Sequence, residues 1–113
     1  MDKISIKIPR NNHYQKSLRL FVAGLASDLN FNIEQIEDLK VLLSEAINYK
    51  MGKDGLDLAF LVGEDRLSIE VVGEDKKKDD KAIAMRDAIL SALADEIETD
   101  GDILRITMRN TNA

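Results

Sequence analysis

The chain of 113 residues contains no cysteine and no tryptophan, and it has one proline and one histidine. The lack of cysteine excludes disulfides, thiolate metal sites and a cysteine nucleophile, and it fits a reducing compartment. Aromatic residues make up only 4% of the chain. Leucine, isoleucine, valine and alanine must therefore fill the core.

Long apolar runs and an excess of basic residues are also missing. The apolar runs are far shorter than the roughly 20 residues of a membrane-spanning helix. The first eight residues alternate polar and apolar without the apolar stretch of a secretory signal. The net charge of −5, from 16 basic and 21 acidic residues, argues against general nucleic-acid binding. We therefore expect a cytoplasmic protein that binds neither membrane nor nucleic acid directly.

Hydrophobic residues make up 44% of the chain, which is enough for one modest core. The apolar spacing predicts a single domain over residues 1–113, built from seven elements. These are a strand at 3–9, helices at 13–29 and from 32 to about 51, strands at 56–62 and 66–72, a helix at 82–97 and a strand at 103–109. The order predicts an α+β fold, a two-layer sandwich in which a four-stranded, mostly antiparallel sheet carries three helices on one face.

Two details refine these helices. Asn32 and Gln35 predict a capping box at the start of the second helix. In the third helix, Met85, Ile89, Leu93 and Ile97 recur at helical spacing with Leu90 beside them, which predicts a shared core-facing side.

Three stretches carry a family resemblance. They are Ile36-Glu37-Asp38-Leu39-Lys40 leading to Ser44-Glu45-Ala46, Arg19 in the first helix, and Ala94-Asp95-Glu96-Ile97-Glu98, then Gly101 and Leu104-Arg105-Ile106-Thr107. On these residues the chain resembles the small anti-sigma-factor serine-protein kinases, which have the histidine-kinase-like ATPase fold. The resemblance extends from Ile4 to Arg109 and implies the same fold for the whole domain.

The resemblance implies a role for the second helix. In the family, a glutamate orients or deprotonates the attacking group, and an asparagine four residues later holds the magnesium that bridges the phosphates. Glu45 matches the glutamate, whereas Tyr49 stands four residues on. Asn48 is three residues on, which rotates it by about 100° from the expected position. The resemblance implies Glu45 as the catalytic residue and Asn48 as the magnesium and cofactor ligand. Without the resemblance, Glu45 would be a solvated acid near a helix end.

The phosphate side of the family site is altered. The family has an acid followed by spaced glycines, which let the backbone approach the nucleotide. An ungapped match puts Gly73 in the acid position, whereas a shift of two residues gives Asp75 as the cofactor-binding acid. With either match, charged residues replace the glycines, and residues 81–86 hold no glycine. This predicts a largely degenerate nucleotide site with no cofactor, or Mg-ATP if the family site is retained.

The favoured hypothesis is therefore an anti-sigma-factor-like regulatory protein that acts by binding another protein. The resemblance implies a sigma factor or an anti-anti-sigma-type protein as partner, Arg19 as a partner-binding residue, and a homodimer formed through the sheet and the first helix. Arg19 could also be an ordinary exposed residue. One alternative is an ATP-dependent serine-protein kinase of the anti-sigma type. Another is a sensor module whose altered pocket binds a different small molecule.

Overall fold

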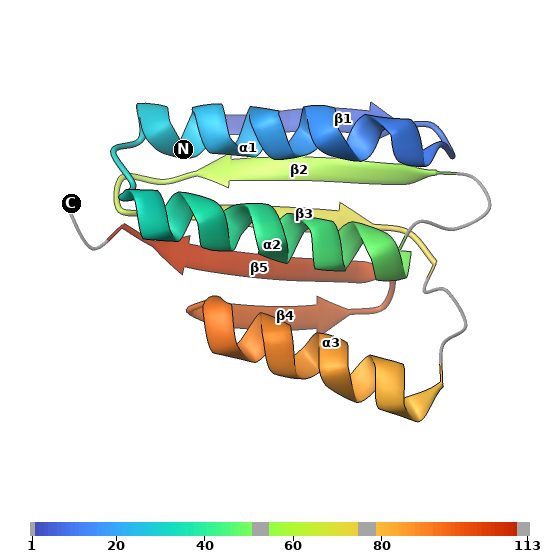
Figure 1. Ribbon diagram of the computed structural model, residues 1–113. Coiled ribbons are helices and arrows are strands. Elements are labelled where there is room, and N and C mark those ends of the chain that lie inside the picture. Colours follow the sequence, from blue (N-terminus) through green and yellow to red (C-terminus); the bar gives the residue numbers. More distant parts are fainter. Residues whose placement is uncertain (1, 51–54, 75–78, 111–113) are drawn as a thin grey trace.

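The computed structural model describes residues 2–50, 55–74 and 79–110 (Figure 1). A 3-10 turn, Asn12–Tyr14, leads into the first helix. The helices are α1 (Gln15–Asp28), α2 (Ile33–Lys50) and α3 (Asp80–Leu93). The strands are β1 (Asp2–Ile8), β2 (Leu56–Val62), β3 (Arg66–Val72), β4 (Glu96–Asp100) and β5 (Ile103–Arg109). Within the described ranges, no helix combines the length and the apolar character needed to cross a bilayer.

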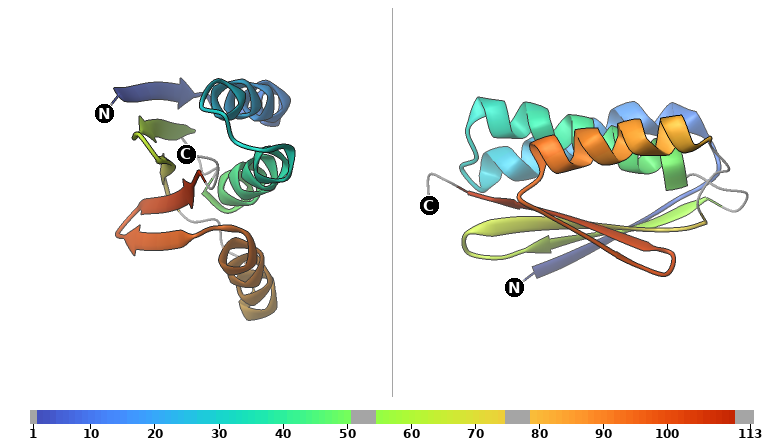
Figure 2. Two further views of the ribbon diagram at one scale, coloured as in Figure 1. Left: turned by 90° about the vertical axis from the view of Figure 1, so that its left-hand side faces the viewer. Right: turned by 90° about the horizontal axis from the view of Figure 1, so that it is seen from below.

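The strands form one sheet in the order β1-β2-β3-β5-β4, and all neighbouring pairs are antiparallel. The three helices lie on the same face of this sheet, with α2 between α1 and α3 (Figure 2). The predicted α+β class and its two layers are confirmed. The predicted number of strands is wrong, since the described sheet has five strands rather than four.

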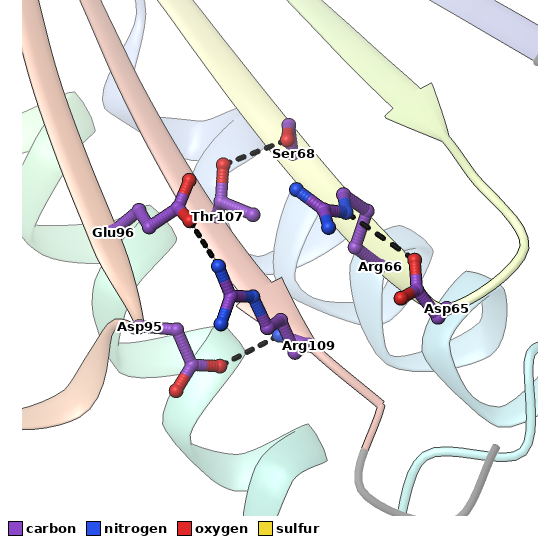
Figure 3. A network of polar contacts seen from close by, with 7 residues as sticks. All are labelled: Asp65, Arg66, Ser68, Asp95, Glu96, Thr107 and Arg109. Carbon is purple, nitrogen blue, oxygen red and sulfur yellow. Dashed lines mark hydrogen bonds and ion pairs between the residues drawn. The ribbon is translucent and has the colours of Figure 1, made fainter.

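The additional strand comes from the segment predicted as the end of the third helix. That helix ends at Leu93, because Ala94 leaves the helical conformation with ψ 149°. The carboxylate of Asp95 then accepts the Arg109 backbone N–H at 2.6 Å, and Glu96 begins β4 (Figure 3). Ile97 pairs with Ile106. Ile97 follows Leu93 by four residues, which is the spacing of one helix face. The same residue also fits a strand that faces the core, so the spacing did not distinguish the two structures.

The core lies between the sheet and α1 and α2. The largest fully buried side chains are Phe60, Leu39, Leu42, Leu43, Ile47, Leu58, Leu67, Ile69, Leu90, Leu104, Ile106 and Val22. Phe60 of β2 meets Phe21 of α1 edge to face, with the ring centroids 5.1 Å apart. Each such leucine, isoleucine or phenylalanine stabilises the fold by roughly 1.5–3 kcal/mol through its burial.

The predicted capping box at α2 is confirmed. The Gln35 backbone N–H donates to Asn32 Oδ1 at 2.8 Å, and the Asn32 N–H donates to Gln35 Oε1 at 3.4 Å. The predicted core face of the third helix is wrong at Met85, which is 61% exposed, whereas Leu90 is buried. The helix is rotated so that Leu90 points to the sheet, and Met85 faces solvent. Asp79 caps this helix by accepting the Ala82 N–H at 2.7 Å.

The opposite face of the sheet carries polar side chains in cross-strand rows. Arg105 donates to Glu70 and to Glu98, both at 2.8 Å. The hydrogen bond to Glu70 is the largest cause that raises the pKa of the Arg105 guanidinium above its ordinary value. Ser68 and Thr107 share a hydrogen bond of 2.7 Å, and Arg109 pairs with Glu96 (Figure 3). These contacts fasten β4 and β3 to β5 across the face that the helices leave open.

Candidate functional site

The residues implied by the family resemblance lie on α2 and on the side of α1 that faces it. Because i and i+4 residues share one helix face, Glu45 and Tyr49 lie one above the other, whereas Asn48 is turned toward a neighbouring face. The packing of α2 between α1 and α3 then decides which helix each side chain meets (Figure 2).

Asn48 is turned toward α1. Its side-chain oxygen accepts a hydrogen bond from Gln15 Nε2 at 3.1 Å, and both side chains are at the protein surface. This oxygen is the atom that the resemblance assigns to magnesium. In the structure it links the start of α1 to the end of α2.

Tyr49 is turned toward α3. Its hydroxyl donates to the Ala82 carbonyl oxygen at 2.6 Å, and the Arg86 guanidinium lies 5.0 Å from the centre of its ring. Arg86 also pairs with Asp87 at 2.9 Å. Position 49, four residues after Glu45, thus links α2 to the first turns of α3. Residues 81–86, which stand in place of the glycine-rich phosphate segment of the family, supply this contact.

Lys50, the last residue of α2, lies next to Gly73, which follows β3. Lys50 is 4% exposed, and its ammonium donates to the Gly73 carbonyl oxygen at 3.4 Å. A Cβ on residue 73 would lie 2.4 Å from Leu56 Cδ2 and 3.0 Å from the Lys50 carbonyl oxygen. Any larger residue at the end of β3 would require Leu56 and the Lys50 carbonyl to shift, so the ungapped acid position is suited to glycine here. Asp75, the other candidate acid, lies outside the described residues.

Arg19 and Glu45 come together at the outer groove between α1 and α2. Arg19 Nη1 donates to Ser44 Oγ at 3.4 Å. A hollow of about 340 Å³ lies here, and its lining is Arg19, Glu37, Lys40, Val41, Ser44 and Glu45. Lys40 pairs with Glu37 at 3.0 Å along one wall. Val41, 44% exposed, supplies an apolar surface.

We call this hollow the Arg19–Glu45 groove. The family resemblance implies separate roles for Arg19 and Glu45, and in the structure both residues line this one groove. Sequence reasoning missed Ser44, Lys40 and Val41 as members of the groove. The spacing of Glu37, Lys40, Val41, Ser44 and Glu45 was the available signal, since steps of three and four residues place them on one side of α2. Within the described residues, no three histidine or acidic side chains gather as a metal site would require.

No family model matches the chain. Curated relatives do match it over most of its length. It is 44% identical to the serine-protein kinase RsbW of Bacillus pumilus over 81 residues, which covers 63% of this chain and 49% of that protein. It is 38% identical to RsbW of Bacillus subtilis over 80 residues, or 65% and 50% of the two chains. RsbW of Listeria monocytogenes is 38% identical over 77 residues, or 62% and 49%.

The chain thus spans about half the length of the curated relatives it matches. The resemblance to the serine-protein kinase family is confirmed over these matched segments of 77 to 81 residues.

Proposed function

We propose, from the premise that this chain is a relative of the RsbW serine-protein kinases, that it is a regulatory protein of the anti-sigma type. It acts in the cytoplasm by binding a sigma factor or an anti-anti-sigma-type protein. The observation that carries this proposal is the Arg19–Glu45 groove, in which a partner-recognition arginine and the family glutamate line one surface. A groove with a cation, an acid and an exposed Val41 suits a protein surface of mixed character.

Charge supports this docking surface. Arg10, His13 and Lys16 precede Arg19, and each of these three side chains is exposed. On a chain of net charge −5 they form a local basic region that would steer an acidic partner toward α1. Arg19 itself lies where that region meets the groove. We therefore assign affinity chiefly to Arg19 and encounter rate chiefly to its three neighbours.

The experiment measures binding of the purified chain to sigma factors and small antagonist proteins encoded by the source genome. Arg19→Glu should weaken binding of the true partner by about tenfold or more, as expected for a central interface arginine. Lys81→Glu makes the same charge change at an exposed site on α3 and is the matched control. If Arg19→Glu and Lys81→Glu bind equally well, Arg19 does not contact the partner.

We also propose that the nucleotide site is largely degenerate. The described residues fit a magnesium ion poorly, because Asn48 Oδ1 already accepts a hydrogen bond from Gln15 Nε2 and the Tyr49 hydroxyl donates to the Ala82 carbonyl oxygen of α3. Among the described residues of α2, Glu45 is then the residue that matches the family site, and the resemblance assigns it to the attacking group rather than to magnesium.

The second candidate function is an ATP-dependent serine-protein kinase. The names of the relatives and the presence of Glu45 favour it. A thermal melt separates the two functions, since a ligand that binds only the native state raises the unfolding midpoint. A midpoint that stays unchanged at millimolar Mg-ATP excludes the kinase. A rise that depends on magnesium, followed by phosphate transfer to a partner serine, would establish it.

A homodimer formed through the sheet is part of the proposal. The helix-free face carries a hollow of about 560 Å³. Small or apolar residues (Ser5, Ala59, Val72 and Ile103) and residues of both charges (Lys3, Lys7, Asp57 and Glu70) form part of its lining. A surface that carries both charges can be self-complementary across a two-fold axis. Sedimentation of the wild type should give a dimer and that of Ile103→Asp a monomer. A monomeric wild type at tens of micromolar protein would contradict this part of the proposal.

A further inference from the structure

β4 is the edge strand of the sheet on the side of α3, and a hollow lies beside it. The sheet order ends at β4, which pairs only with β5 among the described strands. The hollow has a volume of about 450 Å³, and Leu90 of α3, Ile97 and Thr99 of β4 and Leu104 of β5 form part of its lining. This place is on the opposite flank of the molecule from β1 and α1 (Figure 1).

The backbone of β4 is oriented to accept another strand. Asp100 and Ile103 pair across the two-residue turn Gly101-Asp102. The pair that closes such a turn exchanges hydrogen bonds, and hydrogen-bonded pairs then alternate along an antiparallel ladder. Ile97 and Thr99 therefore direct their N–H and C=O groups away from β5, toward the open edge.

The side chains at this edge alternate in chemistry. Ile97 and Thr99 point to the helix side and line the hollow. The other three residues, Glu96, Glu98 and Asp100, point to the helix-free face. Glu98 and Asp100 are exposed. From β5, Arg105 pairs with Glu98. Arg109, also of β5, pairs with Glu96 (Figure 3). The hollow on the helix side is mixed, because Arg86, Asp87 and Ser91 of α3 also line it. The edge thus presents Ile97 and Thr99 beside a mixed hollow on one side and carboxylates on the other.

We propose that this edge binds an extended segment of a partner protein in which apolar residues alternate with lysine or arginine. Added strands bind through main-chain hydrogen bonds, and their alternate side chains give specificity. Here the apolar side chains would enter the hollow beside Leu90, Ile97 and Leu104. The basic side chains would lie next to Glu98 and Asp100, because cross-strand neighbours of opposite charge attract each other. This site is independent of the Arg19–Glu45 groove.

A second copy of the chain is a poorer occupant. Two β4 edges that pair with each other would bring the carboxylates of both copies together, which is unfavourable. The β1 strand does carry the right pattern, with Lys3 and Lys7 alternating with isoleucines. However, a contact between the β4 edge of one copy and the β1 edge of the next is head-to-tail, so it would produce rings or open chains rather than a closed pair.

The probe is a blocked seven-residue peptide that alternates lysine and valine. Its controls are the same peptide with glutamate in place of lysine, and a scrambled lysine–valine peptide. Titration of the full chain, followed by fluorescence anisotropy and by amide chemical shifts, should show saturable binding of the first peptide only. The shifts should centre on β4 and α3, and Arg19→Glu should leave the binding unchanged.

Two variants test the backbone and the charge separately. Thr99→Pro removes an outward N–H and should weaken binding by about tenfold or more, whereas Thr99→Ala keeps that N–H and should weaken binding far less. The double change Glu98→Lys with Asp100→Lys should transfer the preference to the glutamate–valine peptide. Amide spectra of each variant report whether the hairpin is intact, and the charge reversal stands even if the proline disrupts it.

The proposal is overturned if the glutamate–valine peptide binds the wild type as tightly as the lysine–valine peptide. It is also overturned if the charge reversal leaves the preference unchanged. Concentration-dependent self-association of the peptide-free chain that the double change abolishes would instead make a second copy the occupant.

Discussion

The two helices that flank α2 have the same length but very different anchorage. α1 and α3 each have 14 residues. The buried residues of α1 are Leu18, Val22 and Ala26, whereas α3 buries only Leu90. The side of α3 toward α2 is held by polar contacts instead, through the Tyr49 hydroxyl and the Arg86 guanidinium. The α1 side is therefore part of the core, and the α3 side is an attachment to it.

This difference predicts where the molecule opens first. Segments with few buried apolar contacts open at lower free energy than the core. We expect amides of α3 and β4 to exchange with solvent before those of α2, β2 and β3. The two proposed binding surfaces lie one on each flank, so the rigid flank carries the Arg19–Glu45 groove and the adaptable flank carries the β4 edge.

The largest effect should come from the rigid flank. Phe60→Ala removes a ring that is fully buried and that meets Phe21 of α1 at 5.1 Å. The loss should be about 3–5 kcal/mol of unfolding free energy, a large share of the stability of a small domain. Urea denaturation followed by circular dichroism measures it. A loss under about 1 kcal/mol would show that the α1 side is not the core of the fold.

A matched pair of leucines tests the comparison directly. Leu18→Ala in α1 and Leu90→Ala in α3 each remove a buried leucine, and each should cost about 2–4 kcal/mol locally. Leu18→Ala should lower the protection of amides throughout α2 and the sheet. Leu90→Ala should lower protection in α3 and β4 and leave β2 and β3 nearly unchanged. Equal effects on β2 and β3 would mean that α3 is as much part of the core as α1.

Much of this asymmetry could not be predicted from the sequence. The apolar spacing of the third helix looked as regular as that of the first, and it placed Met85 in the core. The strands at 56–62, 66–72 and 103–109 were predicted with the bounds they have, because they are short apolar-rich runs next to turns that contain glycine and aspartate. β4 was missed because Glu96, Glu98 and Asp100 are polar and Ile97 continues a helical spacing. Its partner β5 lies later in the chain, so no local signal decides the conformation.

The candidate site shows the same limit. The positions of Glu45, Asn48 and Tyr49 on one helix follow from the sequence. Which neighbour each side chain meets depends on how α2 is rotated between α1 and α3. The Asn48 contact with Gln15 joins residues 33 positions apart, and the Tyr49 contact with Ala82 joins residues equally far apart. Such contacts are decided by packing, which periodicity alone does not report.

A smaller effect should distinguish one glycine on each flank, Gly101 in the β4–β5 turn and Gly24 inside α1. Gly101, in the β4–β5 turn, has φ +58°, and an added Cβ would meet nothing within 4 Å. Gly101→Ala should therefore cost about 1–2 kcal/mol from backbone strain alone. Gly24 lies inside α1 with equally open space around it, so Gly24→Ala should stabilise the chain by about 0.5–1 kcal/mol. Thermal melts of both variants measure the two signs, and a neutral Gly101→Ala would show that the β4 hairpin contributes little to stability.

The smallest effect should come from the polar contact between α2 and α3. Tyr49→Phe removes the hydroxyl that donates to the Ala82 carbonyl at 2.6 Å and leaves the ring beneath Arg86. A single hydrogen bond of this kind contributes about 0.5–1.5 kcal/mol. Because the contact attaches α3 to α2, the loss should appear in the amide exchange of α3 before it appears in global denaturation. Tyr14→Phe is the control, since Tyr14 is 45% exposed at the start of α1, and it should be neutral. If Tyr49→Phe is also neutral in α3 exchange, the hydroxyl does not help to attach α3 to α2. The tyrosine four residues after Glu45 then needs another explanation.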